Sequence, residues 1–204
     1  MNNVKSNTII NTKQQMWFTN PRLEHLVQFY PYETILMASL EEYIRAGIKG
    51  GDTCIVIASQ EHLKYLDERL ARNNIDTARA RKNGQYINLD AAKTLEKFMI
   101  NGLPDWSSFL DSVGSIVEVT YNNGRPIRAF GEMVALLWQK GNAEAVLQLE
   151  EYWNDLAKIY PFSLFCAYPM LHFDRSIHGE QLNKINKRHS VVTPCFKPRL
   201  SSDY

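Results

Sequence analysis

Residues 50–59 read Gly-Gly-Asp-Thr-Cys-Ile-Val-Ile-Ala-Ser, and the six residues from Thr53 to Ala58 are all apolar or β-branched. A run of this kind, with Gly-Asp before it and Ser-Gln after it, is typical of a strand that is covered on both faces. Such strands belong mostly to parallel sheets, because the connecting helices cover both sides of the sheet. This stretch therefore predicts an α/β protein.

The sequence on either side alternates between strand and helix patterns. Further strands are predicted at 26–30, 86–89, 127–130 and 162–168. Helices are predicted from apolar residues at helical spacing around 35–44, 63–70, 133–139 and 143–159. The alternation predicts a mainly parallel sheet with helices on both faces and right-handed crossovers.

Two local expectations complete this outline. Asp90 is a plausible N-cap for a helix that carries Leu95, Phe98 and Met99. The basic stretch at 79–82 is expected to be a connection without helical structure.

The composition is that of an ordinary globular protein. The chain has 204 residues, of which 45% are hydrophobic and 22% charged, and its formal net charge is +1. This charge provides no general attraction to nucleic acid or to an anionic membrane. No apolar run approaches the roughly 20 residues that cross a bilayer, and the first 15 residues form no apolar signal segment. We therefore expect a cytoplasmic protein.

The cysteines do not form a recognisable ligand pattern. Cys54, Cys166 and Cys195 are widely spaced, and no CxxC or Cys/His spacing accompanies them. We therefore expect buried free thiols, with neither a metal nor a cofactor. A pair formed by Cys166 and His172 is disfavoured, because the thiol lies in a predicted buried strand.

The turn after the first strand lacks the chemistry of a phosphate site. It reads Tyr30-Pro-Tyr-Glu-Thr34, without the glycines and the lysine of a P-loop, and it places a carboxylate where phosphate charge would lie. GxGxxG, GxSxG and HExxH motifs are also missing from the sequence. We therefore expect a protein that is not an enzyme and has no catalytic residues.

Ligands of open α/β sheets usually lie beyond the carboxyl ends of the strands. The residues there are aromatic, with a few carboxylates and hydroxyls, which suits a mostly apolar small molecule held by a few polar groups. The candidate ligand-binding residues are His25, Phe29, Tyr30, Tyr32, Ser59, Asp90, Glu132, Tyr168 and His172.

Several of these residues have a structural alternative. His25 opens a strand and is alternatively a structural histidine, and Glu132 is alternatively a cap of the helix that follows it. Tyr30 and Tyr168 are alternatively aromatic residues at the edge of the core. Trp153, on one helical face with Glu150 and Asn154, is expected to serve packing.

Several motifs, taken in order, resemble the MEDS sensory domain. They are His25-Leu-Val-Gln-Phe-Tyr30, Gly-Ile-Lys-Gly-Gly-Asp52, Gly84-Gln-Tyr-Ile-Asn-Leu-Asp90, Phe98-Met-Ile-Asn-Gly-Leu-Pro-Asp105, Arg128-Ala-Phe-Gly-Glu-Met133, Leu149-Glu150 with Trp153-Asn154, and Cys166-Ala-Tyr-Pro169. The resemblance implies a RecA/KaiC-like sheet with a degenerate P-loop and a sensory role for small, often hydrocarbon-like molecules. His25, Tyr30, Glu132 and Tyr168 match its motif positions.

Composition and the resemblance together predict a domain organisation and a kind of partner. We expect a flexible leader at 1–15, a MEDS-like sensory domain at 16–175, and a polar tail at 176–204 that packs partly back on the domain. Relatives of this family accompany histidine kinases, transcription regulators or sigma-factor modules. The rest of this chain contains no output module, so we expect it to regulate a partner in trans, alone or as a homo-oligomer.

Other functions stay open. The chain could be a partner-switching protein that acts on a kinase or a sigma-factor regulator without any ligand. It could be an NTP-binding RecA-like protein with an atypical phosphate site, in which Glu132 activates water. Nucleic-acid binding through the basic residues of the tail is the least favoured alternative.

Overall fold

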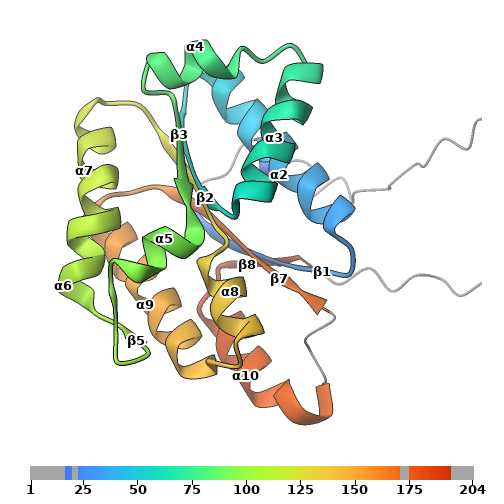
Figure 1. The fold of residues 1–204 in the computed structure, drawn as a ribbon, viewed down its shortest axis with the longest axis vertical. Coiled ribbons are helices and arrows are strands. Elements are labelled where there is room, and N and C mark those ends of the chain that lie inside the picture. The colour runs from blue at the N-terminus through green and yellow to red at the C-terminus, as the bar shows by residue number, and fades with distance from the viewer. Residues whose placement is uncertain (1–16, 20–22, 171–174, 194–204) are drawn as a thin grey trace, which may run out of the picture.

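The computed structural model describes residues 17–19, 23–170 and 175–193. A parallel sheet runs through the molecule, and helices cover both of its faces (Figure 1). Its strand order is β3-β2-β6-β7-β1-β8, and every neighbouring pair in it is parallel. The strands are β1 (His25–Tyr30), β2 (Thr53–Ala58), β3 (Tyr86–Asp90), β6 (Ile127–Gly131), β7 (Ser163–Pro169) and β8 (Val191–Thr193). The predicted fold class, α/β with a parallel sheet between helical layers, is confirmed.

The helices form two layers, one on each face of the sheet. One layer contains α2 (Glu33–Gly50), α3 (Gln60–Arg72) and α4 (Thr77–Lys82). The other contains α5 (Ala91–Glu96), α6 (Trp106–Phe109), α7 (Ser115–Asn122), α8 (Met133–Gln139), α9 (Ala143–Ile159) and α10 (Arg175–Lys187), with a π-helical segment at Leu110–Gly114. Among the residues that the structure describes, no helix combines the length and hydrophobicity that crossing a membrane requires.

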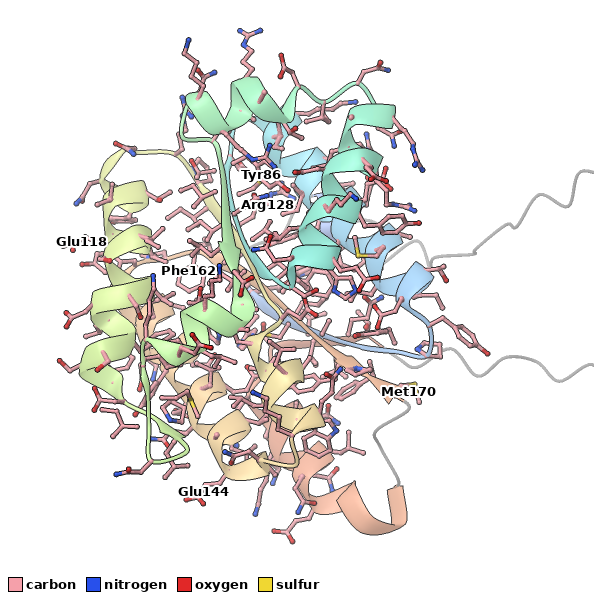
Figure 2. The ribbon with its side chains drawn as sticks, in the orientation of Figure 1. Tyr86, Glu118, Arg128, Glu144, Phe162 and Met170 are labelled. Atoms are coloured by element: carbon pink, nitrogen blue, oxygen red, sulfur yellow. The ribbon has the colours of Figure 1, made fainter. Side chains whose placement is uncertain are left out.

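Each helical layer packs an apolar core against the sheet. All residues of β2, β6 and β7 are buried, which explains why their sequences are mostly apolar rather than alternating. The exception in β6 is Arg128, which is paired with Asp52. Phe162 belongs to the core beneath α7 to α9, whereas Tyr86 belongs to the core beneath α2 and α3 (Figure 2). The alternate residues of each strand thus supply two separate cores.

The helix boundaries follow from capping. Ser59 begins α3 by accepting a hydrogen bond from the His62 amide at 3.3 Å, and Asp90 begins α5 in the same way with the Lys93 amide at 2.9 Å. Helix α2 ends at Gly51, whose φ of 87° lies in the left-handed region that glycine adopts without strain. The predicted cap at Asp90 is therefore confirmed.

Two local expectations were wrong. The stretch at 79–82 is helical and belongs to α4, because the Asp76 carboxylate caps that helix at the Arg79 amide. Helix α5 ends at Glu96, so Phe98 and Met99 lie outside it. Met99 begins a short hairpin of β4 (Met99–Ile100) and β5 (Leu103–Pro104), because Asn101-Gly102 supplies the two positive φ angles of a tight hairpin turn.

The chain after β7 returns to the sheet. Strand β8 lies at its edge, where Val191 pairs with Leu26 and Thr193 with Gln28 of β1. Strand β1 therefore lies between β7 and β8. Residues near both ends of the described chain meet at the amino end of β1.

Candidate functional site

The structure divides the predicted site residues between two regions. Tyr30, Tyr32, Ser59, Asp90 and Glu132 lie at the carboxyl ends of their strands, as the sequence predicted. His25 lies at the amino end of β1, on the opposite edge of the sheet. Phe29 and Tyr168 stack on each other, with ring centroids 5.7 Å apart, in the core beneath α8 and α9. His172 lies outside the described residues.

At the carboxyl edge, Glu132 is buried directly after β6. Its Oε2 atom accepts a hydrogen bond from the amide of Ser59 at 2.8 Å, and its Oε1 atom lies 3.0 Å from Nδ1 of His62. It occupies the cap position of α8, but its side chain makes no capping hydrogen bond there. Glu132 therefore joins the end of β6 to the start of α3.

His62 lies between two carboxylates. Its Nε2 atom is 3.0 Å from Oε2 of Glu33, at the start of α2, and its other ring nitrogen faces Glu132. Contacts with Glu132 and then Glu33 raise the pKa of His62 to about 10, despite partial burial. At neutral pH the imidazole is therefore charged and links α2, α3 and β6.

The other residues of this edge are either paired or exposed. Asp90 accepts a hydrogen bond from the Gln60 amide group at 2.8 Å, and Tyr32 is largely exposed. Tyr30 is buried, and burial together with the Glu33 carboxylate raises its pKa far above the usual range. A hollow of about 420 Å³ lies between α2 and α3, where Glu33, Glu61 and Glu68 line it. These carboxylates make the hollow unfavourable for a phosphate.

A second group of polar residues lies inside the protein. His25 of β1, Cys166 of β7, Glu150 of α9 and His189 after α10 form what we call the buried cluster. Their ligand-type atoms all lie within 4.8 Å of one another. Glu150 and Cys166 are fully buried and His189 nearly so, while the side chain of His25 is 10% exposed. The cluster joins the neighbouring strands β1 and β7 to α9 and the C-terminal segment.

The distances within the buried cluster are short. Nε2 of His25 lies 3.3 Å from Sγ of Cys166 and 3.3 Å from Oε2 of Glu150. Nε2 of His189 lies 3.4 Å from the same carboxylate oxygen. The rings of the two histidines are 3.9 Å apart between centroids. One oxygen of Glu150 therefore faces both imidazoles.

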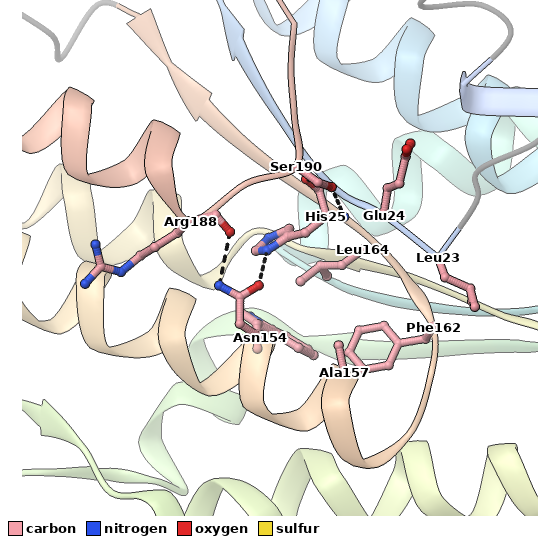
Figure 3. Close-up of a pocket in the computed structure, with 10 residues that line it drawn as sticks. Leu23, Glu24, His25, Asn154, Ala157, Phe162, Leu164, Arg188 and Ser190 are labelled. Atoms are coloured by element: carbon pink, nitrogen blue, oxygen red, sulfur yellow. Dashed lines mark hydrogen bonds between the residues drawn. The ribbon is translucent and has the colours of Figure 1, made fainter.

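Outer partners orient His25, His189 and Glu150. Nδ2 of Asn154 donates to the Arg188 carbonyl at 3.1 Å, so its Oδ1 is the atom that accepts from Nδ1–H of His25 at 3.0 Å (Figure 3). Nδ1–H of His189 donates to the Ile185 carbonyl at 2.8 Å. The hydroxyl of Tyr168 donates to the other oxygen of Glu150. In the neutral form, both histidines thus direct the Nε2 lone pair into the cluster.

Burial and charge act against each other on these groups. Burial would raise the pKa of Glu150, but His189 and then His25 bring it well below its usual range. Burial lowers the pKa of His25, whereas the carboxylate of Glu150 outweighs burial at His189 and raises its pKa. Burial raises the pKa of the Cys166 thiol. Without a cation, one negative charge therefore resides on Glu150 and the thiol keeps its proton.

A small pocket opens beside His25. Its volume is about 230 Å³, and it lies between β1, α9 and the segment that follows α10 (Figure 3). Its apolar walls come from Leu23, Trp153, Ala157, Phe162 and Leu164. Its polar groups come from Glu24, His25, Asn154, Arg188 and Ser190. His25 is thus shared between the pocket and the buried cluster.

Sequence analysis missed two members of the buried cluster. Glu150 was named only as a neighbour of Trp153 on one helical face, and no site was predicted there; it occupies the apolar face of α9 together with Val146, Leu149 and Trp153. A carboxylate in the middle of such a face is a signal of a buried polar site. His189 carries no comparable signal, because it lies in a polar stretch whose position depends on β8.

These observations define the class of protein: an α/β protein with one parallel sheet, a pocket at the amino edge of that sheet, and ionisable groups in its interior. The chain belongs to the MEDS family, the methanogen/methylotroph DcmR sensory domain, whose sequence model matches residues 24–184. The resemblance predicted from the motifs is thereby confirmed, and with it the assignment to a family of sensory domains. The relation to RecA/KaiC-like proteins stays a prediction. No curated protein matches the sequence.

Proposed function

We propose that this chain is a non-catalytic sensory module that binds a small, partly apolar molecule and regulates a partner protein in trans. The observation that carries the proposal is the pocket of about 230 Å³ beside His25. Pockets for drug-sized ligands measure about 300–1,000 Å³, so this one suits a molecule of only a few non-hydrogen atoms. The ligand site is thus proposed at the amino edge of the sheet, not at the predicted carboxyl edge.

The chemistry of the two hollows supports this choice. The pocket beside His25 has mainly apolar walls, with the amide of Asn154 and the imidazole edge of His25 to orient a ligand. The hollow between α2 and α3 also has apolar walls, but three carboxylates line it, and its histidine is already paired with Glu33 and Glu132. A ligand there would have to lie against these carboxylates.

The pocket is also placed to transmit its occupancy. The amide of Ser190 donates to the His25 carbonyl at 2.9 Å, and its hydroxyl oxygen accepts from the His25 amide at 2.9 Å. The carbonyl of Arg188 accepts from Asn154. Ser190 and Arg188 line the pocket and lie between α10 and β8. A ligand that prefers one arrangement of this segment would shift β8 and α10, and so alter a partner surface.

A thermal-shift screen tests the ligand. The panel contains short alcohols, ketones, aldehydes and halogenated alkanes, because the family resemblance implies hydrocarbon-like molecules. A ligand at 100 times its Kd stabilises the folded protein by about 2.7 kcal/mol, which raises Tm by roughly 5–10 °C for a chain of this size. Unchanged melting across the panel would contradict the proposal.

Two matched variants locate the binding site. Ala157→Phe places a ring in the pocket and should abolish the Tm shift, whereas Ala71→Phe adds the same ring on the exposed face of α3 and should preserve it. An equal Tm shift in both variants would show that the ligand binds outside this pocket. Capture of a partner with and without the ligand then separates the sensory role from ligand-independent partner switching.

A further inference from the structure

The buried cluster has the composition of a metal site. Its side chains offer two imidazole nitrogens, one thiol sulfur and one carboxylate oxygen, all of which are ligands for zinc and similar cations. Bonds of about 2.0–2.3 Å in a tetrahedral site place neighbouring donor atoms about 3.3–3.6 Å apart. Three of the separations, 3.3, 3.3 and 3.4 Å, fall at that spacing, and all four donor atoms lie within 4.8 Å of one another.

Two polar atoms of the cluster make no regular hydrogen bond. Within the described residues, Oε2 of Glu150 and Nε2 of His189 are buried without a hydrogen-bond partner. Such atoms cost free energy unless a proton or a cation lies between them. Nε2 of His25 also points its lone pair toward this space, because its other nitrogen donates to Asn154.

The surroundings match those of metal ligands in proteins. A histidine ligand usually donates its second ring N–H to a carbonyl or carboxylate, which fixes its tautomer and its direction. Asn154 and the Ile185 carbonyl provide these contacts for His25 and His189, and Tyr168 holds the second oxygen of Glu150. The pocket that reaches His25 supplies a path by which an ion enters from solvent.

We propose that the buried cluster binds one divalent transition-metal ion, of which Zn²⁺ is the best match to the ligand set and spacing. On binding, Sγ of Cys166 and the ion form a bond, and the thiol proton passes to solvent. The bond to His189 would tie the segment before β8 to β1, β7 and α9. Metal binding needs no small molecule in the pocket. A negative result for the metal therefore does not contradict the proposed ligand, and a negative result for the ligand does not contradict the metal.

The test uses the full chain with its affinity tag removed, stripped by a chelator and titrated with Co²⁺ and with Zn²⁺. We expect one ion per chain by elemental analysis, the intense visible bands of tetrahedral Co²⁺, and a thiolate-to-cobalt band in the near ultraviolet. An ion pair between Glu150 and His189 alone would explain their contact without metal. A colourless cobalt titration, or no thiolate band, therefore overturns the proposal even without any variant.

Matched cysteine variants assign the thiolate. In a Cys195→Ser background, Cys166→Ser should abolish the thiolate band and weaken Zn²⁺ binding at least about 100-fold, since even the loss of an outer partner costs about 10–100-fold. Cys54→Ser makes the same change at a buried cysteine on the other face of the sheet and should bind as the parent does. The histidines are compared in the same way: His189→Gln removes a proposed ligand, and His62→Gln is its control outside the cluster. Equal zinc affinities of Cys166→Ser and Cys54→Ser overturn the proposal.

Discussion

Nε2 of His25 lies 3.3 Å from Sγ of Cys166, although 141 residues separate the two in sequence. The contact arises because β1 and β7 are neighbours in the sheet, with His25 paired to Leu164. Glu150 of α9 then reaches both the histidine pair and Tyr168. A single pair of adjacent strands therefore organises the interior polar groups of this protein.

Removal of the Glu150 carboxylate should be costly. Glu150→Ala leaves the hydroxyl of Tyr168 and both histidines without their shared acceptor, and the loss of one partner from a buried ionic contact costs about 3–5 kcal/mol. Glu151→Ala, at the exposed neighbouring position, removes only a surface contact with Arg188 and should cost less than about 1 kcal/mol. Urea unfolding in the presence of a chelator measures both. Similar midpoints for the two variants would show that the cluster contributes little to stability.

A β-carbon at Gly47 should destabilise the protein. It would lie 2.7 Å from Sγ of Cys54 and 2.8 Å from Cδ of Arg128, whose guanidinium is held by Asp52 at 2.6 Å. We expect Gly47→Ala to cost about 1–3 kcal/mol, as overpacking of a core does. Gly50→Ala, at the exposed end of the same helix, should be neutral or stabilising by up to about 1 kcal/mol. Denaturant unfolding compares them, and a stabilised Gly47→Ala variant would disprove the close packing.

The stability of the protein should depend on pH through His62. Its pKa is raised from 6.5 to about 10 on folding, so the charged imidazolium stabilises the folded state fully below pH 6.5. That contribution is lost as the pH rises toward 10. We expect the free energy of unfolding of the wild type to approach that of His62→Gln over this range.

Glu33→Gln provides the control for this pH dependence. It keeps the histidine but removes one of its two carboxylates, so the slope of stability against pH should lie between those of the wild type and His62→Gln. Unfolding titrations at a series of pH values measure the slopes. Parallel curves for all three proteins would contradict the proposed charge on His62.

Asn154 should act as a positioning residue for the proposed metal. Asn154→Ala removes the acceptor of Nδ1–H of His25, and the loss of such an outer partner weakens metal binding by about 10–100-fold. The stoichiometry and the thiolate-to-cobalt band should persist, because Cys166 is unchanged. Asp155→Ala, next to it on the exposed side of α9, should retain full affinity. A competition titration with a coloured chelator measures both affinities.

Much of the fold could be predicted because it depends on local patterns. The buried strands are continuous apolar runs, the helices carry apolar residues at regular spacing, and Ser59 and Asp90 have the side chains that begin helices. The hairpin at Asn101-Gly102 was missed although its turn residues are a strong local signal, because the preceding apolar residues also fit a helix. Tyr30, Tyr32, Ser59, Asp90 and Glu132 do lie at the carboxyl edge, since parallel strands bring their carboxyl ends to one edge.

The sequence by itself determined that this is a parallel α/β protein of the MEDS family, because strand, helix and motif signals are carried by neighbouring residues. Only the tertiary structure decided that His25 meets Glu150, Cys166 and His189. That meeting depends on the order of strands in the sheet and on the return of the C-terminal segment beside β1. Contacts between residues so far apart along the chain leave no periodic pattern, so the cluster and its pocket become visible only after folding.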